Sequence, residues 1–332
     1  MAIGIRFADV VHTVSPSYKE DVLLPSEHPE FVGGEGLEKD LNQADKEGRF
    51  FGILNGSEYP LKNKVETHPF YELIISTILV QLQQEVLKYK FDFLAHTAQK
   101  LLPYLQKKPE FICSSVARLT EQKFYFFKRS PEALIQILQE LEKINGVYVL
   151  LGTGAPEYEH FLRKISYQHK SLIFINFQSE DIIDAIYREA DLYFMPSLFE
   201  PCGISQMLAM RNGQPCLAHN TGGLKDTISN EKTGFTFTGS TYEEKVIDMV
   251  AVFEKVVKIF LYEKTSWKQI KKNAQEMRFT WEKSVKAYYD LLYKIPKKTV
   301  ERASITNFGI PESGNGFLSE CPVFRPIDFG PN

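Results

Sequence analysis

A carboxylate stands between an apolar run and a helix-like segment in Phe194-Met-Pro-Ser-Leu-Phe-Glu-Pro-Cys-Gly203. The apolar run ends at Met195-Pro196, and Glu200 follows just before Cys202-Gly203 open the helix. A helix N-terminus stabilises negative charge. Glu200 is therefore either a helix cap or a group that faces a site where something else negative binds. The local pattern leaves both interpretations open.

Two cations follow another strand-like run, within Val116-Ala-Arg-Leu-Thr-Glu-Gln-Lys123. A guanidinium can bind a diphosphate through a bidentate fork, and an ammonium binds it as a point charge. Arg118 and Lys123, five residues apart on one predicted loop, are therefore candidates for a diphosphate clamp. A solvated turn is the competing interpretation of this loop taken alone.

Two glycine-rich stretches precede helix-like segments. In Thr221-Gly-Gly-Leu224 the glycines would let the backbone approach an anion, and the amides of a first helical turn can bind phosphate. The same stretch also suits any tight turn. We interpret Gly152-Thr-Gly154 as a plain turn between a strand and a helix.

From residue 111 onward, short apolar runs alternate with stretches of helical length. This alternation predicts βαβ units, and hence an α/β fold with a doubly wound parallel sheet. Such sheets bind ligands beyond the carboxyl ends of their strands, where the polar and glycine-rich loops lie. The predicted strands of this sheet are Phe111–Ala117, Val147–Leu151, Leu172–Phe177, Leu192–Met195, Pro215–Ala218 and Phe235–Phe237.

The first third of the chain carries two further short strands, predicted at Asp9–Val14 and Phe50–Leu54, and mainly helical residues from 66 to 107. The most apolar run, Leu73 to Leu82, is about half as long as a membrane crossing requires. It is predicted to be the buried face of a helix. A further helix is predicted over Trp281–Tyr293, before a tail rich in Pro, Gly and Ser.

The bulk composition excludes several classes of function. The chain has 332 residues and a net charge of -3, which gives no electrostatic case for binding nucleic acid or an anionic membrane surface. Its four cysteines show no CxxC spacing, and its seven histidines form no metal-binding motif. A reducing cytoplasm suits this cysteine usage best.

Several of these stretches together resemble the signature region of bacterial glycogen and starch synthases. The matches at the predicted site are Val116-Ala-Arg-Leu-Thr-Glu-Gln-Lys123, Phe199-Glu-Pro-Cys-Gly-Ile-Ser-Gln206, Ala209-Met-Arg-Asn-Gly213 and Thr221-Gly-Gly-Leu-Lys-Asp-Thr227. Further matches, in the family's order, are Phe7-Ala-Asp-Val-Val-His-Thr-Val-Ser-Pro-Ser-Tyr18, Gly52-Ile-Leu-Asn-Gly56, Leu151-Gly-Thr-Gly-Ala-Pro-Glu-Tyr158 and Trp281-Glu-Lys-Ser284.

The resemblance implies the GT-B architecture, in which two Rossmann-like domains face each other across a cleft. It also implies transfer of glucose from ADP-glucose or UDP-glucose to the non-reducing end of an α-1,4-glucan, with retention of configuration. No metal and no other cofactor is implied, because cationic side chains and helix amides offset the charge of the diphosphate.

The resemblance also assigns roles to individual residues. Arg118 and Lys123 would stabilise the departing diphosphate, and Glu200 would lie near the glucose and its developing positive charge. The remaining donor-binding residues, which would contribute backbone amides, are Cys202, Gly203, Thr221, Gly222 and Gly223.

The printed sequence contains no Lys-x-Gly-Gly-Leu motif, which the family carries in its N-terminal domain, so we expect most of that domain to be absent from it. Residues 1–60 are predicted to be a remnant of that domain and a linker, residues 61–295 the Rossmann-like nucleotide-sugar-binding domain, and residues 296–332 an irregular tail. We expect such a chain to be the donor-binding half of a synthase, active only with an N-terminal half that is either made as a separate chain or missing from this sequence. The alternatives are a catalytically inactive nucleotide-sugar or glucan-binding remnant, and another retaining GT-B transferase with a smaller acceptor.

Smaller departures remove charge and aromatic surface from the predicted donor site. Phe124 stands where the family has Gly, Leu198 where it has Arg, and His219-Asn220 where it has two arginines. Gln178 stands near the position of an aromatic residue that stacks on the donor base, and Phe177 could replace it only in a shifted register. We therefore expect weakened donor binding.

Overall fold

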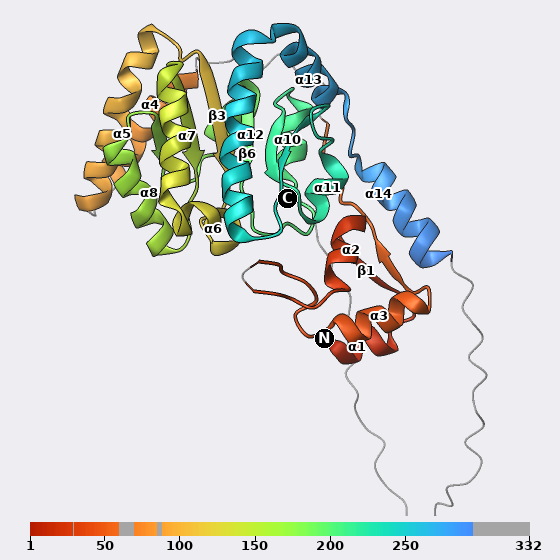
Figure 1. Cartoon of the computed structure of the whole chain (residues 1–332). Helices are drawn as coiled ribbons and strands as arrows, with labels where there is room; N and C mark the ends of the chain where they lie inside the picture. Colours follow the sequence, from red (N-terminus) through yellow and green to blue (C-terminus); the bar gives the residue numbers. More distant parts are fainter. Residues whose placement is uncertain (29, 60–69, 85–87, 295–332) are drawn as a thin grey trace, which may run out of the picture. The chain divides into compact units, whose positions relative to one another are not determined.

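The computed structural model describes residues 1–28, 30–59, 70–84 and 88–294 (Figure 1). Six parallel strands form its main sheet in the order β5-β4-β3-β6-β7-β8. This arrangement confirms the predicted doubly wound α/β fold, and every predicted strand of the sheet is present with ends shifted by at most two residues. The strands are β3 (Phe111–Val116), β4 (Gly146–Leu151), β5 (Leu172–Ile175), β6 (Leu192–Met195), β7 (Cys216–His219) and β8 (Gly234–Phe237).

The direction of winding reverses between β3 and β6. These two strands pair with Cys113 opposite Leu192 and Ser114 opposite Tyr193. The chain proceeds from β3 to β4 and β5 on one side, and from β6 to β7 and β8 on the other. The loops after β3 and β6 therefore diverge, and they leave a crevice at the carboxyl edge of the sheet, where such folds bind ligands.

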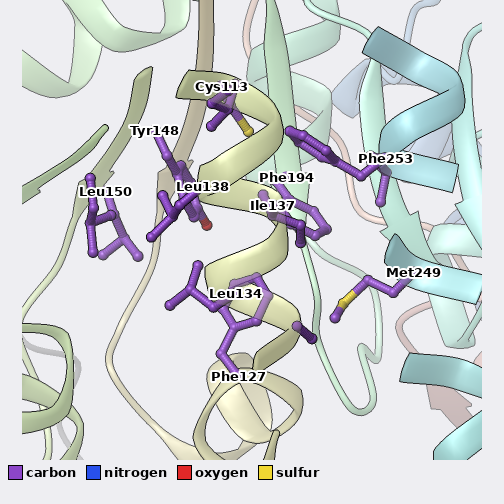
Figure 2. Close-up of a cluster of buried hydrophobic side chains, with 14 of the residues drawn as sticks. Cys113, Phe127, Leu134, Ile137, Leu138, Tyr148, Leu150, Phe194, Met249 and Phe253 are labelled. Atoms are coloured by element: carbon purple, nitrogen blue, oxygen red, sulfur yellow. The ribbon is translucent and has the colours of Figure 1, made fainter. Parts of the chain in front are cut away.

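Alternate residues of the strands serve two separate apolar layers, one on each face of the sheet. On one face, Leu134, Ile137 and Leu138 of α7 (Pro131–Lys143) pack among side chains of β3, β4, β6 and α12 (Tyr242–Tyr262), as Figure 2 shows. Burial on both faces explains why β4, β5 and β6 are continuously apolar rather than alternating.

Over β3, β4 and β5 the opposite face is covered by α4 (Phe70–Gln84), α5 (Lys88–Gln106) and α9 (Glu180–Glu189). The apolar run of α4 is buried on one side only: Ile74 and Ile78 are 0% exposed, whereas Leu79 and Val80 are about half exposed. The prediction of a buried helix face is thus confirmed for that side. Within the part of the chain that the structure describes, no helix has the length and apolarity that crossing a bilayer demands.

A small core of its own holds the N-terminal part together, built from Ile5, Val22, Leu41, Ala44 and Phe50. The two predicted strands here are shorter than expected and pair in parallel. Three helices accompany them that the sequence analysis did not predict. The elements are α1 (Ala2–Phe7), β1 (Val11–Thr13), α2 (Pro16–Val22), α3 (Glu38–Lys46) and β2 (Phe50–Gly52).

The remaining helices connect the strands and close the chain. The helix predicted over Trp281–Tyr293 is present as α14 followed by one π-helical turn. Residues 60, 61 and 295–332 lie outside the described residues, so the predicted domain limits and irregular tail stay predictions. The connecting helices are α6 (Glu121–Arg129), α8 (Pro156–Gln168), α10 (Ser205–Arg211), α11 (Gly222–Thr227), α13 (Lys264–Glu276) and α14 (Trp281–Tyr288).

Candidate functional site

A pocket of about 700 Å³ opens at the carboxyl edge of β3 and β6. Residues from the loops after both strands line it, and Val14 and Asn55 reach it from the N-terminal part. Five of the eight predicted site residues are among its lining residues: Arg118, Lys123, Glu200, Cys202 and Gly203. The structure thus brings the predicted clamp and the predicted carboxylate into one cavity.

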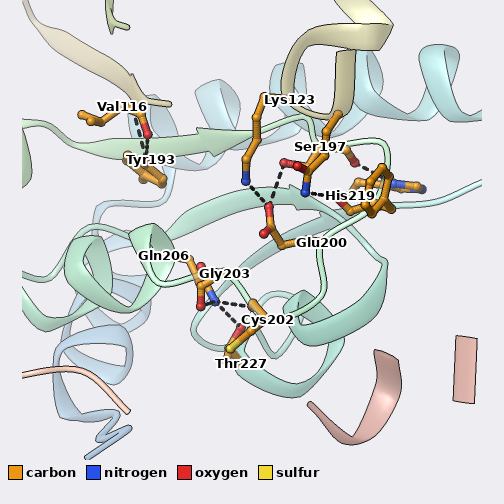
Figure 3. A network of polar contacts seen from close by, with 12 residues as sticks. Val116, Lys123, Tyr193, Ser197, Glu200, Cys202, Gly203, Gln206, His219 and Thr227 are labelled. Atoms are coloured by element: carbon orange, nitrogen blue, oxygen red, sulfur yellow. Dashed lines mark hydrogen bonds and ion pairs between the residues drawn. The ribbon is translucent and has the colours of Figure 1, made fainter. Parts of the chain in front are cut away.

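An ion pair joins the clamp to the carboxylate. The Lys123 ammonium donates to Oε2 of Glu200, and the Ser197 hydroxyl donates to the same oxygen at 3.2 Å (Figure 3). The side chains of Lys123 and Glu200 are only 16% and 8% exposed. Removing one partner would leave the other charge poorly solvated, which is costly. An incoming diphosphate must therefore compete with Glu200 for Lys123.

Arg118 completes the clamp from an exposed position on the loop between β3 and α6. Among the residues that the structure describes, its guanidinium has no hydrogen-bond or ion-pair partner. The loop itself is fixed, because Leu119 donates to the Thr153 carbonyl at 2.9 Å and its own carbonyl accepts from Ala155 at 2.9 Å. The stretch Gly152-Thr-Gly154, predicted to be a plain turn, therefore also braces the clamp loop.

Gln122 ties the two sides of the pocket together. Its backbone carbonyl accepts from the Leu198 amide at 2.8 Å, and its side-chain amide donates to the Phe199 carbonyl at 3.1 Å. The loop that carries Glu200 is thus hydrogen-bonded to the first turn of α6, which carries Lys123. The sequence analysis missed this role, although Gln122 lies inside a motif that it singled out.

Cys202 and Gly203 occupy the turn that leads from β6 into α10. Within the described part of the chain their backbone amides donate to no protein acceptor, so both remain available to a bound anion or hydroxyl. The side-chain amide of Gln206 holds the turn by donating to their carbonyls at 3.1 and 3.0 Å. Burial raises the pKa of the Cys202 thiol to about 11, which makes it a weak nucleophile at neutral pH.

Thr221, Gly222 and Gly223 are placed differently. None of the three is among the described residues that line the pocket. Their amides donate to the His219 carbonyl at 2.9 Å, to the Asp21 carboxylate at 3.0 Å and to the Glu200 carbonyl at 2.9 Å. The prediction that these amides contact the donor stays a prediction, and it requires these bonds to be exchanged.

His219 is a buried structural residue in this structure. Its Nδ1 lies 2.9 Å from the Ser197 carbonyl and 3.1 Å from the Leu198 carbonyl, and it donates to them when it carries a proton. Burial, aided by the nearby positive charge of Lys245, lowers the pKa of His219 to about 4. The imidazole is therefore neutral at pH 7, and the position adds no positive charge to the donor site, as the sequence analysis expected.

The other departures from the family pattern also take defined places. The Phe124 side chain is 1% exposed and packs in the core between α6, α7 and the sheet, at a kink in α6 where its φ is -127°. Gln178 lines the pocket at an exposed position. Phe177 packs against the apolar layer of α4, α5 and α9, which is not the place of a stacking residue in the pocket.

Three residues of one N-terminal segment that bonds to the loops of the site were also missed as functional residues: Ser15, Ser17 and Asp21. Ser15 has a recognisable signal, because a serine followed by proline is a common helix start, and it does cap α2. Asp21 has no local signal, since its partners lie about 200 residues away in the sequence. No group of three metal-ligating side chains occurs among the described residues.

Residues 103–277 match the family model described as glycosyl transferases group 1. The chain belongs to this family. It is also 32% identical over 299 residues to a glycogen synthase of Desulfitobacterium hafniense, covering 88% of this chain and 55% of that protein. A glycogen synthase of Streptococcus sanguinis is 33% identical over 300 residues, covering 88% of this chain and 57% of that protein.

The resemblance to glycogen synthases that the motifs indicated is confirmed by these relatives. The chain spans about half the length of the curated relatives it matches. Among solved structures it resembles the catalytic domain of starch synthase IV from Arabidopsis thaliana bound to ADP and acarbose, with a TM-score of 0.63 and 24% identity over 87% of this chain and 56% of that one. The Anabaena protein HepE in complex with UDP-glucose has a TM-score of 0.53 and 17% identity, over 88% of this chain and 66% of that one. These two likenesses support the fold.

Proposed function

We propose that this glycosyltransferase-family chain is the donor-binding half of a glycogen or starch synthase-type glucosyltransferase. Its substrates would be a nucleoside diphosphate glucose, with ADP-glucose as the first choice, and an α-1,4-glucan acceptor. The single observation that carries this proposal is the pocket in which Arg118, Lys123 and Glu200 meet. Two cations and one carboxylate suit a substrate that carries a diphosphate next to a sugar.

In this proposal the two kinds of charge have separate tasks. Arg118 and Lys123 would offset the negative charge that grows on the diphosphate as the bond to glucose C1 breaks. Such stabilisation of developing charge by fixed groups is usually the largest single term in catalysis. Glu200 would contact the glucose and stabilise the positive charge that develops on its ring. Lys123 would move from Glu200 to the diphosphate as the donor binds, which leaves the carboxylate free to face the sugar.

The pocket also provides neutral donors for the sugar or the diphosphate. The free amides of Cys202 and Gly203 lie on the same turn as Glu200, and Ser197 already contacts that carboxylate. The acceptor glucan and an N-terminal partner chain would complete the site. We place the reaction in the cytoplasm, in keeping with the unpaired, buried cysteines at 113, 202 and 216.

The test is transfer of radiolabelled glucose to glycogen from ADP-glucose and UDP-glucose, by the full chain alone and mixed with the N-terminal half of a curated relative. Glu200→Gln should reduce transfer by about a hundredfold or more, the usual effect of removing one preorganised electrostatic contact. Glu243→Gln, at an exposed position of α12, is the matched control and should retain activity.

Full activity of the Glu200→Gln variant would refute the role given to that residue. Binding of the donor by the wild-type chain without transfer under either condition would instead support the alternative function, a nucleotide-sugar-binding protein without catalysis.

A further inference from the structure

A segment of the N-terminal part supports the two peptide groups that follow Glu200, one directly and one through α11. The segment is Ser15–Val22, which comprises α2 and its N-cap residue. Ser15 is 0% exposed, and its hydroxyl donates to the Pro201 carbonyl at 2.5 Å. The residue that directly follows Glu200 is thus held by a side chain that does not line the pocket.

Asp21 supports the carbonyl group of Glu200 indirectly. Its carboxylate is buried, with Oδ2 accepting from the Gly222 amide at 3.0 Å and Oδ1 from the Lys225 ammonium at 3.1 Å. The next amide along, that of Gly223, donates to the Glu200 carbonyl at 2.9 Å. Asp21 therefore orders the turn that holds the backbone of Glu200.

The segment, the turn after β6 and α11 are packed closely and joined by several hydrogen bonds. A Cβ on Gly222 would lie 2.0 Å from the Glu200 carbonyl oxygen, so the two backbones touch. Nearby, Ser17 donates its amide and its hydroxyl to the Asp226 carboxylate at 2.9 and 2.7 Å. The segment is thereby bonded to the turn after β6 and to α11 at the same time.

A buried carboxylate loses hydration free energy, and apolar contacts of similar volume often give equal or greater stability. Asp21 and Ser15 instead supply directional bonds, and these bonds link the N-terminal core to the loops of the donor pocket. Directional bonds restrict how a backbone can shift, whereas apolar packing restricts it less.

We propose that Ser15 and Asp21 are positioning residues, which hold the backbone of Glu200 so that its carboxylate faces the donor glucose. This inference rests on the proposed function of the pocket. It separates two contributions to donor binding. The clamp of Arg118 and Lys123 binds the diphosphate, and the Glu200 turn, supported from the N-terminal part, binds the glucose.

The experiment compares two ligands on the full chain by calorimetry: ADP, which carries only the diphosphate, and ADP-glucose, which adds the sugar. UDP and UDP-glucose form a second pair. Asp21→Asn keeps the size of the side chain but removes its charge, and Ser15→Ala removes the other bond. Each variant should weaken ADP-glucose binding about tenfold or more, since small misplacements of a binding group have effects of this size, and change ADP binding less than twofold.

Asp40→Asn is the matched control, because Asp40 also lies in the N-terminal part but forms a surface ion pair with Arg6 at 2.6 Å. It should leave both affinities unchanged. Thermal unfolding establishes which variants are folded, and Ser15→Ala carries the test if Asp21→Asn does not fold.

Each remaining outcome is decisive. Equal loss of ADP and ADP-glucose binding, or no loss of either, would overturn the positioning role. Wild-type chain that binds ADP-glucose no better than ADP would overturn it as well, while leaving the diphosphate clamp in place. A wild-type chain that binds neither nucleotide would refute the proposed function itself.

Discussion

Two glycine-containing turns at the same edge of the sheet have opposite roles. The turn after β6 contains Cys202-Gly203 and lines the pocket, and the turn after β7 contains Thr221-Gly222-Gly223 and does not. Within the described residues, the amides of the first turn have no protein acceptor. All three amides of the second turn donate to protein oxygens.

The difference shows that a glycine-rich helix start is not by itself an anion site. Buried amides rarely remain unpaired. An acceptor from elsewhere in the protein can therefore take the place of a bound anion. At Gly222 that acceptor is Asp21, a carboxylate from the N-terminal part. Among the described residues no such group reaches Cys202 and Gly203, and the pocket beside them stays open.

The largest effect should follow from closing the space between the two turns. Gly222→Ala adds a Cβ 2.0 Å from the Glu200 carbonyl oxygen, at a left-handed φ of +44°. We expect the free energy of unfolding to fall by about 2–5 kcal/mol, the sum of a left-handed backbone and an overpacked contact. Urea denaturation measures it.

Gly48→Ala separates these two costs. Gly48 also has a left-handed φ, of +69°, but a Cβ there would have nothing within 4 Å. This variant should lose only the backbone contribution, about 1–2 kcal/mol. Equal losses of unfolding free energy in the two variants would mean that Gly222 is not packed tightly against the backbone of Glu200.

His219, at the end of β7, tests whether the residues around the turn after β7 contribute to stability. Burial lowers its pKa to about 4, from about 6.5 in an unfolded chain. The unfolded state therefore binds the extra proton first as the pH falls, and stability present above about pH 6.5 is lost towards pH 4. The loss should reach about 3 kcal/mol.

His219→Asn keeps a donor near the position of Nδ1 and removes the titration. The comparison is the free energy of unfolding of both chains by urea between about pH 7 and pH 4. Stability should fall less steeply with acidification in the variant. Parallel curves for the two chains would show that the buried imidazole does not titrate as described.

Much of this arrangement follows from the sequence, and the part that does not has a physical reason. Apolar runs of strand length, separated by helical stretches, predicted the parallel sheet, and the strand ends predicted where Arg118, Lys123 and Glu200 would gather. These inferences depend on local periodicity and on topology, both of which are written in neighbouring residues.

The contacts that distinguish the two turns depend on long-range packing instead. Ser15 bonds to Pro201, and Asp21 bonds to Gly222, across 186 and 201 residues of sequence. No local pattern indicates which amides such groups will occupy. The ion pair between Lys123 and Glu200 escaped the sequence analysis for the same reason, although both residues were singled out.

The pocket beside the turn after β6 depends on the clamp of Arg118 and Lys123, and these two cations differ in their surroundings. Arg118→Ala should weaken binding of a nucleoside diphosphate by about 1.5–3 kcal/mol, the range for hydrogen bonds to charged groups. Lys123→Ala should have a larger effect, because it also leaves the Glu200 carboxylate unpaired beside the diphosphate. Adding Glu200→Gln to Lys123→Ala should restore part of the loss, and the double-mutant cycle measures that coupling.

The central claim is that Arg118, Lys123 and Glu200 form one diphosphate-sugar pocket, and calorimetric titration of the full chain with ADP and UDP tests it most directly. The wild-type chain should bind at least one of them, Arg118→Ala and Lys123→Ala should each weaken that binding, and Lys128→Ala, an exposed cation of the same helix, should not. Unchanged affinity in both clamp variants, or no binding by the wild-type chain, would contradict the account.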